Sequence, residues 1–510
     1  MDSYGHRGTK IARNTLMLYV RMLVLMLVGL YTSRVVLGAL GEDDFGVYNV
    51  VGGVVSMFTI ISGALNSAVS RFITFEMGKG ADAQLNKVYS TAVTIQLILA
   101  AVVVLLAEPL GLWFIDNKMT IDPSRIPAAR WVLHFSLLAF VINLMSVPQM
   151  ASITAHEHMS AYAYIGILDG LLRLGVAFLI LHSPIDRLIY YAALMAGVVL
   201  IVRMAYGLYC RLHFEECRYR PVFDRPLIRE MFSFAGWNFI GVTSGVLRDH
   251  GGNILVNLFS GPAVNAARGV AVQLNGAVQG FVTNFMTAVN PQITKSYAAG
   301  EKEYMFSLVR RSSRMSFFLL FLIALPVIFN ADYLLSIWLK EVPEHSSLFV
   351  QLFLIFALSE SLSNPMITAM LATGNIRNYQ LVVGGIQLLN LPVSYVCLRM
   401  GAIPEVTVIV AIIISQICMW ARLLMLSKAT GFPVLPFLEE VYFSVLFKVV
   451  CGSLVVPLIL EAVKPEGIAG FLVSASVCVL WSMFVIMALG LQSDERKWIV
   501  NKIKDKFVRK

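Results

Sequence analysis

The residues best suited to chemistry in this sequence are arginines that lie inside long apolar segments. Arg21 and Arg34 fall in the first such segment, and Arg248 and Arg268 fall in two later ones. A charged side chain at the centre of a bilayer costs about 2.5–3.5 kcal/mol on insertion scales, so each must have a partner, a water-filled cavity or a route to the surface. These four arginines are predicted to bind an anionic substrate, although snorkelling explains Arg34 equally well.

Amide side chains accompany the arginines at helical spacing. Asn275 and Gln279 fall on the same helical stripe as Arg268, and Asn66 belongs to a milder polar stripe in an earlier segment. Lipid does not tolerate such a face, so it must line protein or water. Hydrogen bonds between helices are an equally good explanation of the amides. We predict that Asn66, Asn275 and Gln279 contact the substrate.

Two carboxylates in apolar segments are candidates for coupling to an ion. Asp249 follows Arg248 and precedes a glycine pair, and Glu360 stands alone shortly before Pro365. A buried carboxylate can bind and release a proton. The alternatives are local compensation of Arg248 by Asp249 and a hydrogen-bonded role for Glu360 at a proline kink.

Signals for other chemistry are weak in this sequence. No phosphate-binding Walker loop is present, and His156 and His158 form a poor metal-binding pair. The six cysteines fall in predicted helices or on the cytoplasmic side, so no disulfide is expected. No catalytic residue, metal or cofactor is predicted.

Composition places the chain in a membrane. Hydrophobic residues make up 58% and charged residues 14% of its 510 positions, far from the values of soluble domains. Runs of about 20 apolar residues are long enough to cross the bilayer as helices. The predicted spans, fourteen in all, are Asn14–Leu37, Phe45–Asn66, Val88–Ile115, Trp131–Thr154, Tyr162–Leu181, Leu188–Tyr209, Phe232–Phe259, Ala263–Thr287, Met315–Leu339, Leu348–Ala372, Leu381–Leu398, Val406–Leu426, Phe443–Leu460 and Ile468–Leu491.

The loops between these spans are short, and their charges predict an orientation. Most of the 40 lysines and arginines fall on the side of the amino terminus, which places both termini in the cytoplasm. The net charge of +9 is then a topology signal, and no nucleic-acid partner is expected. Residues 492–510 suit either a basic amphipathic helix on the cytoplasmic leaflet or a solvated tail.

The chain also matches itself at a displacement of about 220 residues. The matching pairs are Gly41 with Gly261, Gly80 with Gly300, Pro148 with Pro365, Ala155 with Ala372 and Tyr162 with Tyr379. Each match is weak, but the two displacements of 220 and 217 residues agree closely. A duplicated helix bundle in a membrane is typical of alternating-access transporters, which bind substrate between the halves.

Several short motifs near the amino terminus resemble a known family. They are Arg13-Asn14-Thr15, Ser33-Arg34-Val35-Val36-Leu37-Gly38, Asp44-Phe45-Gly46-Val47-Tyr48, Gly63-Ala64-Leu65-Asn66 and Ser70-Arg71-Phe72. Together they resemble bacterial flippases of the Wzx type, which handle repeat units of O-antigen, capsule or exopolysaccharide. This type belongs to the multidrug, oligosaccharidyl-lipid and polysaccharide exporter superfamily. The motif match is clearest from Ala12 to Gly80.

The resemblance implies an all-α membrane fold of two six-helix lobes related by a pseudo-twofold axis. The lobes are expected at residues 1–217 and 226–428. An extra two-helix unit at 440–491 is similar to that of lipid II flippases, and the basic tail follows at 492–510.

The resemblance also implies a function and partners. The chain is expected to flip an undecaprenyl-pyrophosphate-linked oligosaccharide, without enzyme activity, from the cytoplasmic to the outer leaflet of a bacterial inner membrane. Membrane lipid and other polysaccharide-assembly proteins are the expected partners, and the membrane potential or an ion gradient is the expected driving force. The alternatives are a drug or cation antiporter of the same superfamily and a membrane-embedded polysaccharide polymerase or ligase.

Overall fold

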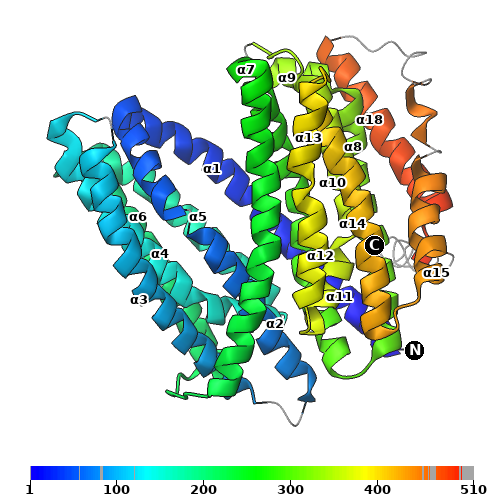
Figure 1. Ribbon diagram of the computed structural model, residues 1–510, viewed down its shortest axis with the longest axis horizontal. Helices are drawn as coiled ribbons and strands as arrows, with labels where there is room; N and C mark the ends of the chain where they lie inside the picture. The colour runs from blue at the N-terminus through cyan, green and yellow to red at the C-terminus, as the bar shows by residue number, and fades with distance from the viewer. Residues whose placement is uncertain are drawn as a thin grey trace, which may run out of the picture. The chain divides into compact units, whose positions relative to one another are not determined.

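The chain is helical throughout the part that the computed structural model describes (Figure 1). That part comprises residues 2–56, 58–80, 84–119, 121–339, 341–450, 453–457, 459, 467–492 and 495–496. The α-helices are α1 (Asp2–Ser56), α2 (Thr59–Gly78), α3 (Leu85–Asn117), α4 (Ile126–Ala155), α5 (Met159–Leu179), α6 (Arg187–His213), α7 (Arg225–Ala298), α8 (Lys302–Phe329), α9 (Ala331–Trp338), α10 (Ser346–Ser361), α11 (Asn364–Ala372), α12 (Arg377–Leu388), α13 (Asn390–Arg399), α14 (Val406–Thr430), α15 (Val434–Phe437) and α18 (Gly467–Val485). Shorter 3₁₀ turns are η2 (Pro123–Arg125), η3 (Ile180–His182) and η4 (Glu215–Cys217), and η5 (Leu438–Val450) and η6 (Ile486–Gly490) are π-helical. No strand occurs among these residues, as an all-α fold requires.

Acidic residues begin several of these helices. The Asp186 carboxylate accepts hydrogen bonds from the backbone N–H groups of Leu188 and Ile189 at the start of α6. Asp224 accepts one from Leu227 at the start of α7, where Pro226 fits the first turn because it has no N–H to leave unpaired. These caps fix where α6 and α7 begin.

Two long helices are broken at glycines that lie 220 residues apart. Gly41 interrupts α1 with φ 79° and ψ 172°, and Gly261 interrupts α7 with φ 81° and ψ 178°. This backbone conformation is essentially restricted to glycine. Each break therefore divides one continuous stretch of helix into two segments with different directions.

Other features repeat at the same displacement. Gly80 and Gly300 both have positive φ, of 70° and 75°, and α4 and α11 end at the matched Ala155 and Ala372. The turn that follows has positive φ in both copies, 60° at Glu157 and 79° at Gly374. These matched conformations support the predicted duplication.

An ion pair is also duplicated. Arg125 Nη1 lies 2.6 Å from Asp186 Oδ2, and His345 Nδ1 lies 2.6 Å from Glu405 Oε1. Each pair joins the residues before one helix to the residues before the next helix but one. The repeat therefore extends to side chains that no short motif connects.

The number of spans differs from the fourteen predicted. Ten helical segments of the described chain are long and apolar enough to cross a membrane: Lys10–Gly41, Leu85–Asn117, Pro123–Ala155, Met159–His182, Arg187–His213, Lys302–Phe329, Ser346–Ala372, Arg377–Arg399, Val406–Thr430 and Gly467–Gly490. Phe45–Asn66, Phe232–Phe259, Ala263–Thr287 and Phe443–Leu460 have no counterpart among these ten. The reason in α7 is polarity, because Arg248 to His250 and Arg268 with Asn275 and Gln279 interrupt its apolar runs. Phe443–Leu460 lies partly outside the described residues.

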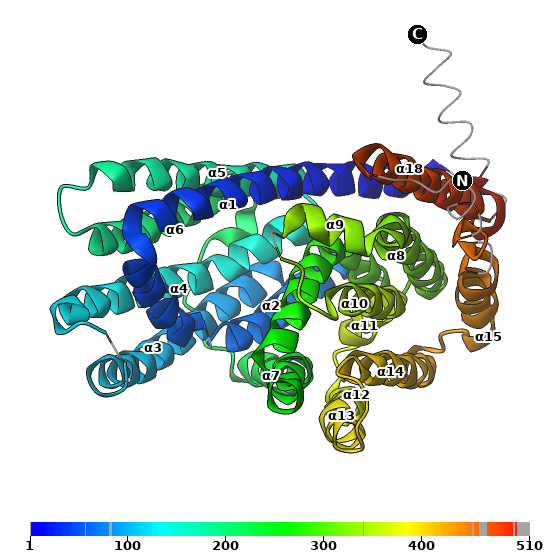
Figure 2. The ribbon, with the colours of Figure 1, turned by 90° about the horizontal axis from the view of Figure 1, so that it is seen from above.

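The chain divides into two compact units. Unit 1 comprises Met1–Thr243, Thr287–Glu301 and Gly374–Arg377, and unit 2 comprises Ser244–Met286, Lys302–Thr373 and Asn378–Lys510. In unit 1, α1 runs along α5, and α4 packs against α3 and α6 (Figure 2). In unit 2, α10 packs against α8 and α14, and α18 packs against α8. Thr287–Glu301 and Gly374–Arg377, which belong to the second repeat, thus pack with helices of the first.

Replacing Gly261 by alanine tests the helix break. Alanine at φ 81° is strained, and we expect Gly261→Ala to lower the free energy of unfolding by about 1–3 kcal/mol. Gly269→Ala is the matched control, because Gly269 is helical and a Cβ there meets nothing within 4 Å. It should stabilise by about 0.5–1 kcal/mol. Denaturation in mixed detergent micelles measures both, and equal effects would contradict the assigned break.

Candidate functional site

Arg248 and Arg268 both lie over phenylalanine rings of α10 in unit 2. The Arg248 guanidinium is 4.8 Å from the centroid of the Phe356 ring, and that of Arg268 is 5.2 Å from the Phe353 ring. Phe353 and Phe356 are one helical turn apart and therefore share a face of α10. A cation over an aromatic face is stabilised by the ring quadrupole, most strongly away from water. One helix face thus holds two of the predicted substrate-binding arginines.

Polar partners complete the surroundings of both arginines. Arg248 Nε donates a hydrogen bond to Asp249 Oδ1 at 2.9 Å, although the Asp249 side chain is 63% exposed. Arg268 is buried and donates to the Asn253 side chain. A Cβ on Gly252 would lie 2.6 Å from Arg268 Nη2, so this glycine makes room for the guanidinium. The predicted local compensation of Arg248 by Asp249 is present, together with the aromatic contact.

Glu360 is not the lone carboxylate that the sequence suggested. One of its oxygens lies 3.5 Å from a nitrogen of Arg422, a residue of α14 that is 3% exposed. Arg422 is also hydrogen-bonded by the Tyr379 side chain. The sequence hides this pair because its members are 62 residues apart. Glu360 follows Phe356 by one turn, so it extends the same face of α10.

A small cavity joins three of the predicted residues. Arg248, Gln279 and Glu360 line a space of about 100 Å³ together with Asn364. At about 30 Å³ per molecule, this volume suits roughly three waters rather than a sugar. The structure thus places a carboxylate, a guanidinium and an amide around a pocket of hydration size within unit 2.

Arg21 has a different setting in unit 1. Its guanidinium lies 4.6 Å from the centroid of the Tyr162 ring, and its Nε occupies the space that a side chain on Gly166 would fill. No carboxylate lies within ion-pair distance of Arg21 among the described residues. Tyr162 and Tyr379 are matched by the repeat, so each copy of this tyrosine contacts an arginine.

The remaining predicted residues have fewer contacts. Arg34 and Asn66 are exposed. Asn275 is half-buried, and its Oδ1 has no hydrogen-bond partner in the described part of the chain. The structure does not bring these three residues into the arginine cluster on α10, and their role in binding stays a prediction.

An ionic cluster in unit 1 was not foreseen from the sequence. The buried Glu157 carboxylate lies 2.8 Å from Lys295 Nζ and 2.9 Å from Lys10 Nζ, and its backbone oxygen accepts a hydrogen bond from Asn14. Burial alone would raise the pKa of Glu157, but Lys295 and Lys10 outweigh burial and hold the pKa below its ordinary value. Because Lys295 belongs to the second repeat, Glu157 ties that repeat to the first. We call this set the Glu157 clasp.

Some of these contacts had detectable signals. Arg422 lies in a predicted apolar span, so the criterion that selected Arg248 applies to it as well. Phe353, Phe356 and Glu360 have helical spacing on one face. By contrast, Glu157 and Lys295 are 138 residues apart in polar segments, and nothing in the sequence pairs them.

Comparison with known proteins identifies relatives of this chain. A family model described as "Polysaccharide biosynthesis protein" matches residues 11–297, more than half of the chain. The chain is 21% identical over 323 residues to "Uncharacterized membrane protein EpsK" of Bacillus subtilis (strain 168), a match that covers 62% of this chain and 63% of that relative.

Two solved structures show which fold the chain resembles. A MATE protein in complex with MaD3S superposes with a TM-score of 0.72 at 12% identity, over 83% of this chain and 97% of that one. A MOP superfamily transporter from Pyrococcus furiosus Vc1 (DSM3638) superposes with a TM-score of 0.70 at 12% identity, over 83% and 96% of the two chains. Its binding pocket is described as having reverse polarity. The chain therefore has a MATE-like fold.

A double-mutant cycle tests the pairing of Glu360 with Arg422. Either Glu360→Gln or Arg422→Gln leaves a largely buried charge without its partner, which costs about 3–5 kcal/mol for a fully buried pair. We expect the double variant to be more stable than the sum of the single effects predicts, by about 0.5–3 kcal/mol. Unfolding in mixed detergent micelles supplies the four free energies. Additive effects would show that the two charges do not interact.

The Glu157 clasp predicts a pH-dependent contribution to stability. A lowered carboxylate pKa stabilises the folded state above the ordinary pKa, near 4.3, and this contribution is lost as the pH falls through the folded-state value. Glu157→Gln should therefore cost about 1–3 kcal/mol at pH 7 and much less near pH 3. Asp116→Asn, in the exposed Arg130 pair, is the control and should change little at either pH. A Glu157→Gln effect that stays constant with pH would contradict the clasp.

Proposed function

This chain belongs to the polysaccharide biosynthesis protein family, and on that basis we propose that it carries a lipid-linked oligosaccharide across the membrane. Family and fold point to a transporter rather than an enzyme. The proposed substrate is an undecaprenyl-pyrophosphate-linked oligosaccharide, flipped from the cytoplasmic to the outer leaflet of a bacterial inner membrane. An oligosaccharide needs such a path, because a hydroxyl moved into hydrocarbon without a partner costs about 4–8 kcal/mol.

The observation that carries this proposal is the excess of cations among apolar helices. Around α10, the three arginines Arg248, Arg268 and Arg422 face the two carboxylates Asp249 and Glu360. In unit 1, Arg21 has an aromatic partner and no carboxylate partner among the described residues. Such a surplus suits an anion, and guanidinium groups bind pyrophosphate through bidentate, charge-assisted hydrogen bonds.

Membrane potential supplies a driving force for this direction of transport. A pyrophosphate diester carries about two negative charges, and the cell interior is negative. Outward movement then gains about 2.3 kcal/mol per charge for each 100 mV, or about 4.6 kcal/mol in total. Coupling to an ion is a further element of the proposal, with Glu360 beside its hydrated cavity and the exposed Asp249 as the groups that bind it.

Transport by alternating access requires one end to open while the other closes. We place the termini in the cytoplasm and the lobes at residues 1–217 and 226–428, as the basic loops and the repeat favour. The Glu157 clasp joins Lys10 and Lys295, which then lie at the cytoplasmic end. Its ion pairs have to break before a head group can enter from that side.

A drug or cation antiporter is the nearest alternative within this fold. A site for cationic substrates needs an excess of carboxylates, whereas arginines outnumber carboxylates around α10. A polymerase or ligase would need catalytic residues on a substantial outer loop. The short loops between the described helices offer little room for such a site.

A reconstitution experiment tests the function. Purified protein in liposomes should translocate an undecaprenyl-pyrophosphate-linked oligosaccharide, and combined Arg21→Gln and Arg248→Gln should slow it about tenfold or more, because each lost charged hydrogen bond is worth about 1.5–3 kcal/mol. The measurement is the fraction of head groups accessible to an added enzyme outside. Arg130→Gln, in an exposed ion pair, is the matched control and should be as fast as the unaltered protein.

Three results would contradict the proposal. One is unchanged translocation in the double variant, provided that it elutes and melts as a folded protein. Another is translocation of a cationic drug with no movement of the oligosaccharide, which would identify an antiporter. The third comes from a deletion strain: single repeat units stranded on the outer leaflet would indicate a polymerase, whereas units trapped inside support a flippase.

A further inference from the structure

A second and much larger cavity lies in unit 1. It measures about 870 Å³ and is bounded by the first turns of α7 and by the turn Gly374–Arg377 that leads into α12. This volume is within the range of about 300–1,000 Å³ that is usual for small-ligand sites. None of the residues predicted to bind substrate lines it.

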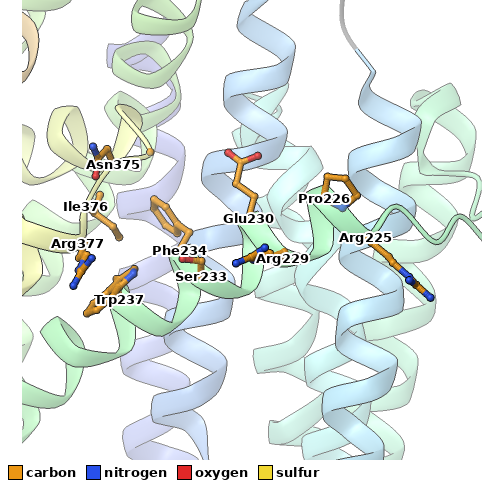
Figure 3. A pocket seen from close by; sticks show the side chains of 11 residues that line it. Arg225, Pro226, Arg229, Glu230, Ser233, Phe234, Trp237, Asn375, Ile376 and Arg377 are labelled. Carbon is orange, nitrogen blue, oxygen red and sulfur yellow. The ribbon is translucent and has the colours of Figure 1, made fainter.

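One wall of this cavity is a stripe on α7. Arg225, Arg229, Ser233 and Trp237 follow one another at four-residue spacing and therefore share a helix face. Figure 3 shows Trp237 and Arg377 close together at one end of the pocket, with Arg225 at the other end and directed away from them. The Arg377 guanidinium lies 5.2 Å from the centroid of a ring of Trp237. The pocket thus has a flat aromatic surface at one end and cations along its length.

The opposite wall is held in a fixed conformation. Gly374 has φ 79°, and a Cβ at this position would lie 2.6 Å from Nη2 of the buried Arg71. Ile376, two residues later, is fully buried. The turn is therefore anchored on both sides of Asn375, which is itself exposed to the pocket. A wall fixed in this way lowers the ordering cost of binding.

The charge of the pocket is unbalanced. Arg225, Arg229 and Arg377 are exposed, and no carboxylate lies within ion-pair distance of any of them among the residues with described side chains. Glu230 is the only acidic residue in the lining, and it interacts electrostatically with the buried Arg71. The lining therefore favours an anion.

We infer that this pocket binds a phosphorylated sugar, the head group of the transported lipid, before the head group reaches the arginines on α10. Arg229 and Arg377 would hold the phosphate oxygens as bidentate donors. The Trp237 ring offers an apolar face to the carbon side of a pyranose, while Ser233 and Asn375 bind hydroxyls. The inference rests on the proposed function for the identity of the ligand.

The location of the pocket fits a first binding site. α2 contacts both the pocket turn and the Glu157 clasp: Arg71 meets Gly374, and a Cβ on Gly78 would meet the backbone of Lys295 at 2.7 Å. Arg71 and Gly78 are seven residues apart, or about 10 Å along a helix. With the proposed orientation, the pocket lies at the cytoplasmic end, near the contacts that have to open.

Equilibrium binding to the full chain tests this inference without requiring transport. The protein is placed in phosphatidylcholine nanodiscs and titrated with three probes: a short-chain prenyl-pyrophosphate-linked N-acetylglucosamine, inorganic pyrophosphate and phosphatidylglycerol. Arg229→Gln combined with Arg377→Gln should raise the Kd of the sugar-bearing probe about tenfold or more. Arg218→Gln is the matched control, because Arg218 is exposed nearby but does not line the pocket.

A tryptophan variant separates a sugar site from a plain phosphate site. Trp237→Ala should weaken the sugar-bearing probe about tenfold and leave inorganic pyrophosphate within about twofold. Equal weakening of both probes, or no weakening, would overturn the assignment of a sugar. Competition by phosphatidylglycerol at the same affinity would identify a phospholipid site instead.

Two further outcomes distinguish this inference from the proposed function. Arg248→Gln should retain binding in the pocket, because Arg248 belongs to unit 2 and does not line it. Loss of binding in that variant, with binding retained in Arg229→Gln with Arg377→Gln, would overturn the pocket while leaving the flippase intact. Conversely, normal binding by a protein that translocates no oligosaccharide would support the pocket and contradict the function.

Discussion

A guanidinium group among apolar helices has to find a partner, and this requirement shapes both units. Arg21, Arg248 and Arg268 each lie over an aromatic ring, at centroid distances of 4.6, 4.8 and 5.2 Å. Gly166 and Gly252 leave the space that Arg21 and Arg268 occupy. An aromatic face stabilises a cation without neutralising it. The charge therefore remains available to an anion, which an ion pair with a carboxylate would not allow to the same extent.

The repeat explains how one sequence builds two similar frameworks that carry different chemistry. Gly41 and Gly261 break their helices with nearly identical dihedral angles, and the turns at Glu157 and Gly374 share a left-handed backbone. The backbone is duplicated, but the side chains have diverged. In the first copy the turn carries a carboxylate that binds two lysines. In the second, the absence of a side chain admits Arg71.

Much of the fold could be predicted because its signals are local. Apolar runs gave ten of the spans, and the glycine matches gave the repeat. The spans in α7 could not be counted in this way, because the polar residues that make the helix useful also interrupt its apolar run. The site was less predictable. Arg248 and Glu360 could be selected by type, but the pairing of Glu360 with Arg422 depends on which helices pack together, and no residue spacing encodes that.

The difference between the two turns gives them unequal sensitivity to dissolved ions. Glu157 holds Lys10 and Lys295 by charge, with both ammonium groups partly open to solvent, so counterions at high ionic strength weaken that contact. The turn at Gly374 is held by close packing of a buried side chain against bare backbone, which mobile ions cannot reach. Increasing salt would thus loosen one repeat's hinge selectively, in a molecule whose backbone is otherwise nearly symmetric.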